Sequence, residues 1–542
     1  MTIDKLIIKN YKIFKDIEIS MNDKINIFVG KNNSGKTTIL DAINLLFTGK
    51  INGATIMQRL TTDWFNKDCR DEYIKNISDI SDKKQASLPE ILIEAYLNCK
   101  ENDDFRIKKT KGANNSSTKE LFGIRLEIKF DKELYGNIYE EYLKNNKIVD
   151  IPIEFYKVEL FSFSGEKFST FFTTNKIGII DNTKKDYYFS SNRFISESVS
   201  NLLSDEQNKD ISVNYKAIRR DFNNHLSKIT NDSLKDKQIK FCLKEENPEK
   251  WKDEISLVIN DLPYEYNGIG SQNIIKAELF IQQNQDIHVL LVEEPENNLT
   301  YTKMCLLINK LSNEKNKQIF ISTHSSFIAN KLELKHLQLI NDQQKIKTFS
   351  NLDEHTNKFF QKLPDYNVLR LILSDNIILV EGPSDELIIQ SAYYDKYEKY
   401  PIDDGIDVMS VNGISFEHYC KLAKLIEKHI TVVTDNDGKS KIKKEKFQQY
   451  EEYVKLCMEE DDELNTLEPS FLEANKNKFE EFRKIVYLGK DINKYDDKKL
   501  LDFIKKNKTD WSLRVFEYKN ENKIIVYPKY ILKAISKDDK DK

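Results

Sequence analysis

The segment at residues 30–37, GKNNSGKT, constrains the fold of this chain more than any other feature. It fits the pattern G-x4-G-K-[ST], follows an apolar run at residues 25–29, and precedes residues 37–47, whose apolar side chains recur at helical spacing. Such a loop needs a strand before it and a helix after it, because backbone N–H groups of the loop and the helix N-terminus together surround phosphate oxygens. The pattern therefore predicts an α/β domain that binds a nucleoside triphosphate.

Individual residues of this loop have distinct expected roles. Lys36 is expected to reach the β- and γ-phosphates of ATP, and Thr37 is expected to ligate Mg²⁺. The rest of the expected nucleotide-binding set lies in the loop and at the start of the helix: Asn32, Asn33, Gly35 and Thr38. The alternative, a glycine loop of purely structural use, is disfavoured by the strand and the helix on either side.

Two further segments are typical of the catalytic half of an ATP site. Residues 288–292 form an apolar run ending in Glu293 and Glu294, and the carboxyl end of a parallel strand is where such sheets bind ligands. We expect Glu293 to hold Mg²⁺ and Glu294 to orient the attacking water. His324 follows a second apolar run at residues 318–322, which suits a γ-phosphate sensor. Without the phosphate loop, the glutamates would indicate a solvated strand end and the histidine a structural residue.

Length and composition limit the class of protein. At 542 residues the chain suits two or three domains. No apolar run of about 18 residues is present to span a bilayer, and the N-terminus lacks the pattern of a secretory signal, so we expect a cytoplasmic protein without a membrane partner. The six cysteines are scattered and indicate neither a disulfide framework nor a zinc site. Because the net charge is −4, any nucleic acid must bind to a local basic patch.

The last third of the chain alternates between strand-like and helical patterns. Strands are expected at residues 376–380, 406–411 and 430–434, with helices at residues 385–394 and 416–429 between them. Alternation of this kind implies a parallel sheet.

Acidic residues follow two of these strands. Glu381 and Asp385 come after the first strand, and Asp435 and Asp437 come after the third. Because the carboxyl ends of parallel strands share one edge of a sheet, we expect the four carboxylates to converge on one crevice. They would repel one another unless hard divalent cations such as Mg²⁺, Mn²⁺ or Ca²⁺ neutralise them, and a two-metal arrangement can cleave phosphodiesters. The alternative interpretation is a strand end and an ordinary turn.

The N-terminal motifs resemble the ABC-type ATPases of the SMC and RecF kind. The segment NYKIF at residues 10–14, the phosphate loop, GIGSQ at residues 268–272, EEPE and His324 occur in that family's order. In such proteins a signature segment of one subunit completes the ATP site of the other, so the resemblance implies a head-to-head homodimer with Ser271 as a γ-phosphate ligand. This signature departs from the transporter form LSGGQ, and residues 297–300, NNLT, lack the histidine or aspartate that related proteins often carry there.

The C-terminal pattern resembles a TOPRIM domain, and an ABC-type ATPase followed by TOPRIM is the architecture of the OLD (overcoming lysogenization defect) family of endonucleases. The matching segments are ILVEGPSDE, VNGISFEHY at residues 411–419, VVTDNDG, and LEPSFLEAN at residues 467–475. The resemblance implies a lysine that assists cleavage, for which NKTDWSL offers Lys508. It also implies these metal-site acids: Glu381, Asp385, Asp435, Asp437 and Glu468. Related proteins are the Gabija nuclease subunit and retron-associated OLD-like effectors, which act in anti-phage defence, and the sequence does not choose between them.

The expected fold class is therefore α/β, with an ABC-type ATPase domain that carries an inserted helical arm, followed by a TOPRIM parallel-sheet domain. The arm is expected to be a dimerisation element, because its charges alternate with sparse apolar residues. Strand-like pieces inside the ATPase domain lie at residues 91–96, 124–130 and 158–163. The expected boundaries are residues 1–190 and 260–350 for the ATPase domain, 191–259 for the arm, 351–370 for a linker and 371–542 for TOPRIM.

These expectations combine into an ATP-regulated, divalent-metal-dependent DNA endonuclease. Its expected partners are DNA, a second copy of the chain, and a partner protein or retron nucleic acid of a defence system. Five lysines follow the second acidic pair and either hold the DNA backbone or form a solvated face: Lys439, Lys441, Lys443, Lys444 and Lys446. The alternative function is an ATP-switched DNA-binding sensor or scaffold that does not cut. A topoisomerase or primase is disfavoured, because no strand-passage or zinc module is recognisable.

Overall fold

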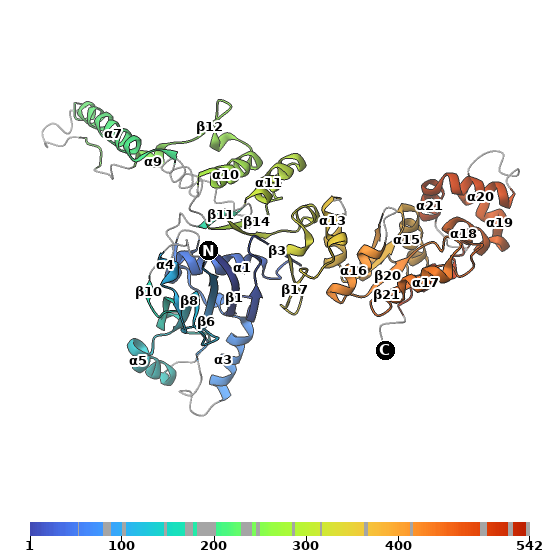
Figure 1. The fold of residues 1–542 in the computed structure, drawn as a ribbon, viewed down its shortest axis with the longest axis horizontal. Coiled ribbons are helices and arrows are strands. Elements are labelled where there is room, and N and C mark those ends of the chain that lie inside the picture. The colour runs from blue at the N-terminus through green and yellow to red at the C-terminus, as the bar shows by residue number, and fades with distance from the viewer. Residues whose placement is uncertain are drawn as a thin grey trace. The chain divides into compact units, whose positions relative to one another are not determined.

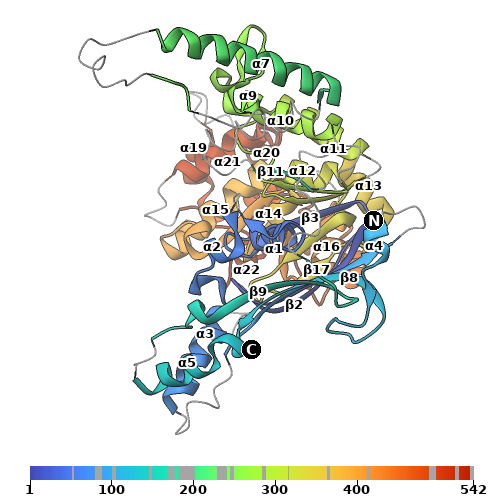
Figure 2. The same ribbon diagram turned by 90° about the vertical axis from the view of Figure 1, so that its left-hand side faces the viewer.

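The structure is a computed structural model that describes most of the chain (Figure 1; Figure 2 shows the same ribbon turned by 90°). It divides into two compact units, Met1–His324 with Gln338–Ile346, and Ser325–Leu337 with Lys347–Lys542. Within the described residues, no helix is both long and apolar enough to cross a membrane. The described residues are 1–51, 54–79, 88–99, 105–145, 149–168, 177–181, 202–228, 241–244, 250–283, 288–314, 317–362, 367–411, 416–487, 496–518 and 524–537.

The first unit contains a seven-stranded sheet in the order β10-β9-β8-β6-β1-β2, with β7 paired to β8. Every strand pair recorded in it is antiparallel. The strands predicted at residues 91–96, 124–130 and 158–163 are present as β6, β8 and β9. The strand bounds are β1 Thr2–Tyr11, β2 Phe14–Ser20, β6 Ile91–Asn98, β7 Lys111–Gly112, β8 Leu121–Phe130, β9 Tyr156–Ser162 and β10 Lys167–Phe168.

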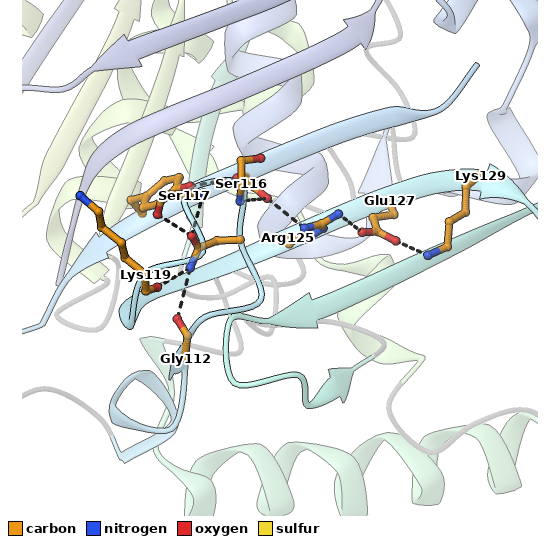
Figure 3. Close-up of polar contacts among 10 residues, drawn as sticks. Gly112, Ser116, Ser117, Lys119, Arg125, Glu127 and Lys129 are labelled. Carbon is orange, nitrogen blue, oxygen red and sulfur yellow. Dashed lines mark hydrogen bonds and ion pairs between the residues drawn. The ribbon is translucent and has the colours of Figure 1, made fainter. Parts of the chain in front are cut away.

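The two faces of this sheet differ, because alternate residues of a strand point to opposite sides. Leu126 and Ile128 of β8 are fully buried in the core. Arg125, Glu127 and Lys129 lie on the other face, where Figure 3 shows them side by side and joined by ion pairs. This face therefore combines paired charges with a small apolar cluster of Ile7, Tyr96 and Phe163.

The second sheet of this unit carries the phosphate loop. Its order is β11-β14-β15-β3-β16-β17, and β11, β14, β15 and β3 run parallel. Helix α1, Lys36–Thr48, follows β3 and contacts strands of both sheets, and ten of its residues are buried because its apolar positions extend around most of its circumference. The strand bounds are β3 Ile25–Gly30, β11 Ile177–Asp181, β14 Val289–Glu293, β15 Gln318–Ser322, β16 Leu337–Ile340 and β17 Ile346–Thr348.

The remaining elements of the first unit are short hairpins and surface helices. The hairpins are β4 (Lys50–Ile51) with β5 (Ala54–Thr55), and β12 (Val258–Ile259) with β13 (Leu262–Pro263). The helices are α2 Ile56–Arg59, α3 Lys67–Asp79, α4 Phe105–Lys108, α5 Lys132–Asn145, α7 Asp205–Leu226, α9 Trp251–Glu254, α10 Ile269–Gln283 and α11 Tyr301–Asn313.

Helix α7 lies within the segment predicted as an arm. A capping box starts it, in which the Ser204 hydroxyl accepts a hydrogen bond from the backbone N–H of Gln207, and no residue of the helix is buried. Three large apolar side chains are exposed along it, Val213, Ile218 and Phe222. Parts of the predicted arm, residues 191–201, 229–240 and 245–249, lie outside the described residues.

The second unit contains a four-stranded sheet in the order β19-β18-β20-β21, in which all pairs are parallel. The α/β alternation predicted for this region is confirmed. The strands are β18 Asn376–Val380, β19 Ile406–Ser410, β20 Ile430–Val433 and β21 Val454–Cys457. The helices are α12 Ser326–Lys331, α13 Glu354–Lys362, α14 Val368–Leu373, α15 Pro383–Tyr397, α16 Phe416–Ile426, α17 Ser440–Gln448, α18 Leu467–Ala474, α19 Phe479–Val486, α20 Asp497–Lys506, α21 Lys508–Glu517 and α22 Lys529–Ala534.

The segment expected to be a linker, residues 351–370, holds helix α13 and the start of α14. Helix α13 is polar overall, so its sequence resembles that of a linker. Phe360 and Thr356 are nevertheless fully buried. The hydroxyl of Thr356 also bonds to Nδ1 of His418 in α16 at 2.9 Å. Residues 412–415 of the predicted TOPRIM segment 411–419 lie outside the described residues.

Candidate ATP and nuclease sites

The backbone of the phosphate loop has a positive φ at two positions. Asn33 and Gly35 adopt φ of 62° and 103°, and a Cβ atom at Gly35 would lie 2.4 Å from the ring of Phe14. Phe14 is fully buried beneath the loop, which gives the NYKIF segment a packing role. Lys36 donates to the carbonyl oxygens of Gly30 and Lys31, both at 3.0 Å. Its ammonium therefore folds back over the loop.

The two predicted Mg²⁺ ligands of the ATP site lie in contact. The hydroxyl of Thr37 donates to Oε1 of Glu293, which ends strand β14. They meet because β14 and β3 both lie in the parallel sheet, separated by β15, and their carboxyl ends share one edge. The remaining predicted loop residues are placed as follows: Asn32 and Asn33 are exposed, and Thr38 is buried in the first turn of α1.

Glu294 and His324 face each other beside these ligands. Nε2 of His324 lies 4.0 Å from Oε1 of Glu294, and the side chain of Asn297 donates to Oε2 of the same carboxylate. Burial lowers the pKa of His324, and the charge of Lys36 lowers it further. The imidazole is therefore neutral at pH 7, with one nitrogen able to donate and one to accept a hydrogen bond.

Glu296 is a site residue that the sequence reasoning missed. One of its oxygens, Oε1, accepts from the hydroxyl of Thr323 at 2.9 Å and from the backbone N–H of His324 at 2.7 Å. The carboxylate thus fixes the turn after β15 that presents His324. In the sequence, Glu296 is the third acid of EEPE. It lies in the loop after β14 and contacts the loop after the neighbouring strand, β15.

The predicted signature serine is close to a cation. Ser271, in the first turn of α10, accepts a hydrogen bond from Nζ of Lys303 in α11 at 2.6 Å. A Cβ atom at Gly270 would lie 2.0 Å from the carbonyl oxygen of Asn298, so only glycine allows this backbone approach. The signature segment therefore packs on the loop that follows Glu294. Within the described residues, no recorded hydrogen bond or ion pair joins Ser271 to the phosphate loop of its own chain.

The topology of the second unit creates a crevice at the carboxyl ends of β18 and β20. The chain leaves β18 for β19 on one side and then returns to β20 on the other side. Neighbouring strands whose connections run in opposite directions leave a crevice between them, where open α/β sheets bind ligands. Glu381 follows β18, and its Oε1 accepts from the hydroxyl of Thr434 and from the backbone N–H of Asp435 at 2.9 Å.

Four acids interact electrostatically at this crevice. Burial raises the pKa of Asp385 to about 7, and the charges of Glu381 and Glu468 contribute to the rise. Burial also raises the pKa of Asp435 to about 8, helped by Glu381, Asp385 and Glu468. Among these residues a direct contact joins Glu381 to the backbone of Asp435, so the segments after β18 and β20 meet at the crevice.

Lys508 lies beside the same acids. Its Nζ is 3.2 Å from Oε1 of Glu468, a side chain that is 2% exposed. Burial alone would lower the pKa of Lys508, but the charges of Glu468, Asp435 and Asp385 raise it. The ammonium is therefore firmly protonated, and it stands at the edge of the crevice.

Asp437 pairs with a lysine at the exposed side of this centre. Its backbone has φ of 53°, and its carboxylate is 68% exposed and accepts from Nζ of Lys443 at 2.8 Å. The turn is fixed by Asn436, whose amide donates to the carbonyl oxygens of Glu459 and Asp461. The same Nζ lies 3.7 Å from Oε1 of Glu381, so Lys443 lies between the two carboxylates.

The donor set at the crevice fits a hard divalent cation. Carboxylate oxygens are the ligands that ions such as Mg²⁺ or Mn²⁺ select, and an ion bound here would oppose the rise in pKa that burial and neighbouring acids give Asp385 and Asp435. Among the described residues no three acidic, histidine or cysteine side chains already point at one common position. Glu381 and Glu468 instead accept from Thr434 and Thr466, so these two carboxylates would turn toward a bound cation.

Tyr530 is a second residue near the acids that no sequence pattern marks. It lies in α22, which packs against β20 and β21, and its side chain is 7% exposed. Burial raises its pKa, and the charges of Asp385 and Asp435 add to the shift, so its hydroxyl stays protonated near the acids. The C-terminal helix has no motif that would have marked this position.

Comparison with known proteins agrees with the order of the two domains. Residues 1–329 match the AAA ATPase domain family, and residues 372–437 match the TOPRIM domain of overcoming lysogenization defect protein-like proteins. The chain is 22% identical over 504 residues to endonuclease GajA of Bacillus cereus, covering 78% of this chain and 71% of that protein. A shorter match to the DNA replication and repair protein RecF of Bacillus cytotoxicus is 38% identical over 50 residues, 9% of this chain and 13% of RecF.

A structural neighbour is the C-terminal region of the Burkholderia pseudomallei OLD protein, with a TM-score of 0.23, 20% identity, and coverage of 30% of this chain and 97% of that one. The sequence matches support an ATPase linked to a nuclease domain, in the order predicted from the motifs. The chain belongs to the AAA ATPase domain family, joined in one polypeptide to a TOPRIM domain of the overcoming lysogenization defect (OLD) type.

Proposed function

We propose that this protein is an ATP-regulated, divalent-metal-dependent DNA endonuclease of OLD type that acts in the cytoplasm as an anti-phage defence effector. The observation that carries the proposal is the contact of Glu381 with the backbone of Asp435 at a switch-point crevice, with Lys508 3.2 Å from the buried carboxylate of Glu468. The match to endonuclease GajA supports DNA as the substrate. The defence role follows from the family resemblance of the motifs.

The four acids would hold the divalent cation, Mg²⁺ or alternatively Mn²⁺ or Ca²⁺. Such an ion supplies an activated water and polarises the phosphate that is cleaved. Lys508 is suited to bind a non-bridging phosphate oxygen, because its ammonium is protonated and 57% exposed while its partner Glu468 is buried. The buried acids position the ion, and the exposed cation positions the substrate.

ATP would bind at the first unit and regulate cleavage. Thr37 and Glu293 are placed to hold Mg²⁺, Lys36 to contact the β- and γ-phosphates, and Glu294 to orient the attacking water. Neutral His324 can donate to the γ-phosphate without adding charge. Replacing Lys36 with Ala should weaken ATP binding, whereas Glu294→Gln should retain binding and slow hydrolysis, which a nucleotide-binding assay beside a phosphate-release assay would separate.

We also propose a homodimer, with an additional protein or retron nucleic acid as a further partner. Two features support it: a signature segment whose Ser271 has no recorded contact with its own phosphate loop among the described residues, and helix α7 with exposed Val213, Ile218 and Phe222. Deletion of residues 203–250 should weaken assembly. Light scattering that finds the intact protein monomeric at micromolar concentration, with and without ATP, would contradict the dimer.

The nuclease is tested with purified full-length protein and supercoiled plasmid. Cleavage is followed with Mg²⁺, Mn²⁺ or Ca²⁺, with and without ATP, for the parent, Glu381→Ala and a surface control, Glu427→Ala, whose carboxylate is 66% exposed and pairs with Lys347. Glu381→Ala should abolish cleavage and keep ATP hydrolysis, while Glu427→Ala should match the parent. DNA binding without cleavage in every metal would favour the sensor or scaffold instead.

A further inference from the structure

Two lysine-rich surfaces lie near the nuclease centre and differ in the acids around them. The first belongs to helix α17 and the residue before it. The second is the turn between helices α20 and α21, residues 503–509, which we call the lysine corner. The exposed lysines are Lys439, Lys441, Lys444 and Lys446 on the first surface, and Lys505, Lys506 and Lys508 on the second.

The α17 surface lies against an acidic loop. This loop, residues 459–463, follows strand β21 and reads EEDDE, so five consecutive side chains are acids. Two contacts hold it beside α17. Oδ1 of Asp462 accepts from the backbone N–H of Ser440 at 2.8 Å, and Glu460 pairs with Lys444 at 2.7 Å. The negative charge of the loop therefore offsets the positive charge of the α17 lysines.

The lysine corner has no acids of its own. Its sequence, FIKKNKT, contains three lysines and no acidic residue. Among the described residues, neither Lys505 nor Lys506 has a recorded ion pair or side-chain hydrogen bond. The side-chain amide of Asn507 donates to the carbonyl oxygen of Phe503 at 2.9 Å, which closes the end of α20. The corner therefore presents exposed positive charge on an ordered turn.

The lysine corner also lies next to the acids of the crevice. Helix α20 packs against α18, the helix that carries Glu468. Lys505 and Lys506 occupy the last turn of α20, and Lys508 begins α21 with its Nζ 3.2 Å from Oε1 of Glu468. Because Lys506 and Lys508 are two residues apart, their Cα atoms are at most about 7 Å apart. Cations at that spacing can contact neighbouring phosphates of one DNA strand.

We propose that the DNA backbone binds along the lysine corner through Lys505 and Lys506, and that the acidic loop at residues 459–463 keeps it away from helix α17. Phosphates held at these two lysines lead to the phosphate that Lys508 contacts. Such contacts reach phosphate oxygens and not base edges, so they give affinity and position without sequence preference. The inference rests on the proposed nuclease function and names the surface that presents its substrate.

The experiment measures DNA binding separately from cleavage. Full-length protein is titrated against a short fluorescein-labelled duplex in EDTA, which prevents metal-dependent cutting, at several salt concentrations. Lys505→Gln combined with Lys506→Gln should weaken binding about tenfold and reduce the slope of log Kd against log salt by about two, since each phosphate contact contributes about one. The matched control, Lys441→Gln with Lys444→Gln on α17, should change the affinity less than about twofold.

A second pair of substitutions tests the acidic loop. Glu460 and Glu463 are exposed, and replacing both with Gln should tighten binding and steepen the salt dependence, because the α17 lysines then become available to phosphates. Unchanged affinity in this variant, or a larger loss from the α17 pair than from the corner pair, would overturn the inference. Melting temperatures equal to that of the parent show that each variant is folded.

Plasmid cleavage by the parent separates this inference from the nuclease proposal. A parent that binds DNA through the lysine corner but cuts with no metal would refute the nuclease and support the surface. A parent that cuts, with a corner pair that retains full affinity, would refute the surface and leave the nuclease standing. A parent that binds no DNA would overturn both.

Discussion

Two groups of acids in the described part of this molecule have neighbours of different charge. On the charged face of the antiparallel sheet, Glu94 is fully buried, accepts from the backbone N–H of Ser116 at 3.0 Å and pairs with Arg125 at 3.3 Å. Figure 3 shows Arg125 continuing into an alternating row with Glu127 and Lys129. Each acid of that row has a cation on a neighbouring position of the sheet.

Glu159 of the same face gives the clearest contrast with the nuclease centre. Burial alone would raise its pKa, but Lys167, Lys157 and Lys129 together hold it below its ordinary value. Asp435 is partly exposed, and burial raises its pKa to about 8, with the charges of Glu381, Asp385 and Glu468 adding to the rise and that of Lys508 opposing it. Burial alone therefore does not mark a functional acid. The balance of neighbouring charges does, because acids prevail around Asp435 whereas lysines prevail around Glu159.

The largest expected effect that tests this comparison is on DNA cleavage. Asp435→Asn removes an acid whose neighbours are mainly other acids and should reduce plasmid cleavage by about 100-fold or more, because its oxygens would hold the metal. Glu159→Gln removes a buried acid that three lysines surround and should leave cleavage unchanged. A gel assay at fixed Mn²⁺ measures both, and ATP hydrolysis in parallel confirms that the first unit is folded. Equal losses in the two variants would break the distinction.

The sequence predicted the site residues that follow strands of a parallel sheet. Lys36 and Thr37 follow a strand within one short motif, and Glu381 and Asp435 follow strands of a parallel sheet, so backbone topology alone brings each set to one edge. Glu468 was reached only through the family resemblance, because its helix α18 carries no pattern that distinguishes it from a surface helix.

The sequence could not predict the parts that depend on side-chain direction. Asp437 is two residues from Asp435, but a turn with φ of 53° aims it at Lys443. Five lysines look alike in the sequence, and only the phase of helix α17 turns one of them inward. The register of β8 against β6, which pairs Arg125 with Glu94, is likewise a contact between strands far apart in the chain.

Stability should change with opposite signs in the two regions. Glu94→Gln leaves Arg125 with one fewer partner and weakens the bond from Ser116, so it should cost about 2 kcal/mol. Asp435→Asn removes repulsion among acids and should stabilise metal-free protein at pH 8.5 by roughly 1–2 kcal/mol. Calorimetry in EDTA measures both, with Glu18→Gln, an exposed pair partner of Lys5, as the unchanged control. Two changes of the same sign would argue against the comparison.

The stability of the metal-free protein should also fall as pH rises from 6 to 8.5. Asp385 and Asp435 titrate near 7 and 8 when folded, whereas ordinary aspartates titrate near 3.9. Between these values the folded state binds more protons than the unfolded state, so unfolding becomes easier with increasing pH, by roughly 4 kcal/mol over this range. Saturating Mn²⁺ should abolish the decline. A metal-free melting temperature independent of pH in Asp435→Asn and in the parent alike would contradict the assignment.

The smallest expected effect tests whether the lysines around Glu159 can replace one another. Glu159 has three lysines nearby, Lys167 at 2.8 Å, Lys129 at 3.5 Å and Lys157 at 3.8 Å. Lys167 is 61% exposed, and the other two cations remain when it is replaced, so Lys167→Met should cost less than about 0.5 kcal/mol. Urea unfolding of the single variant and of Lys167→Met with Lys157→Met distinguishes the cases, because the double change should cost more than the sum of its parts. Additive losses would mean that each lysine stabilises Glu159 independently. The remaining lysines would then not replace one that is lost.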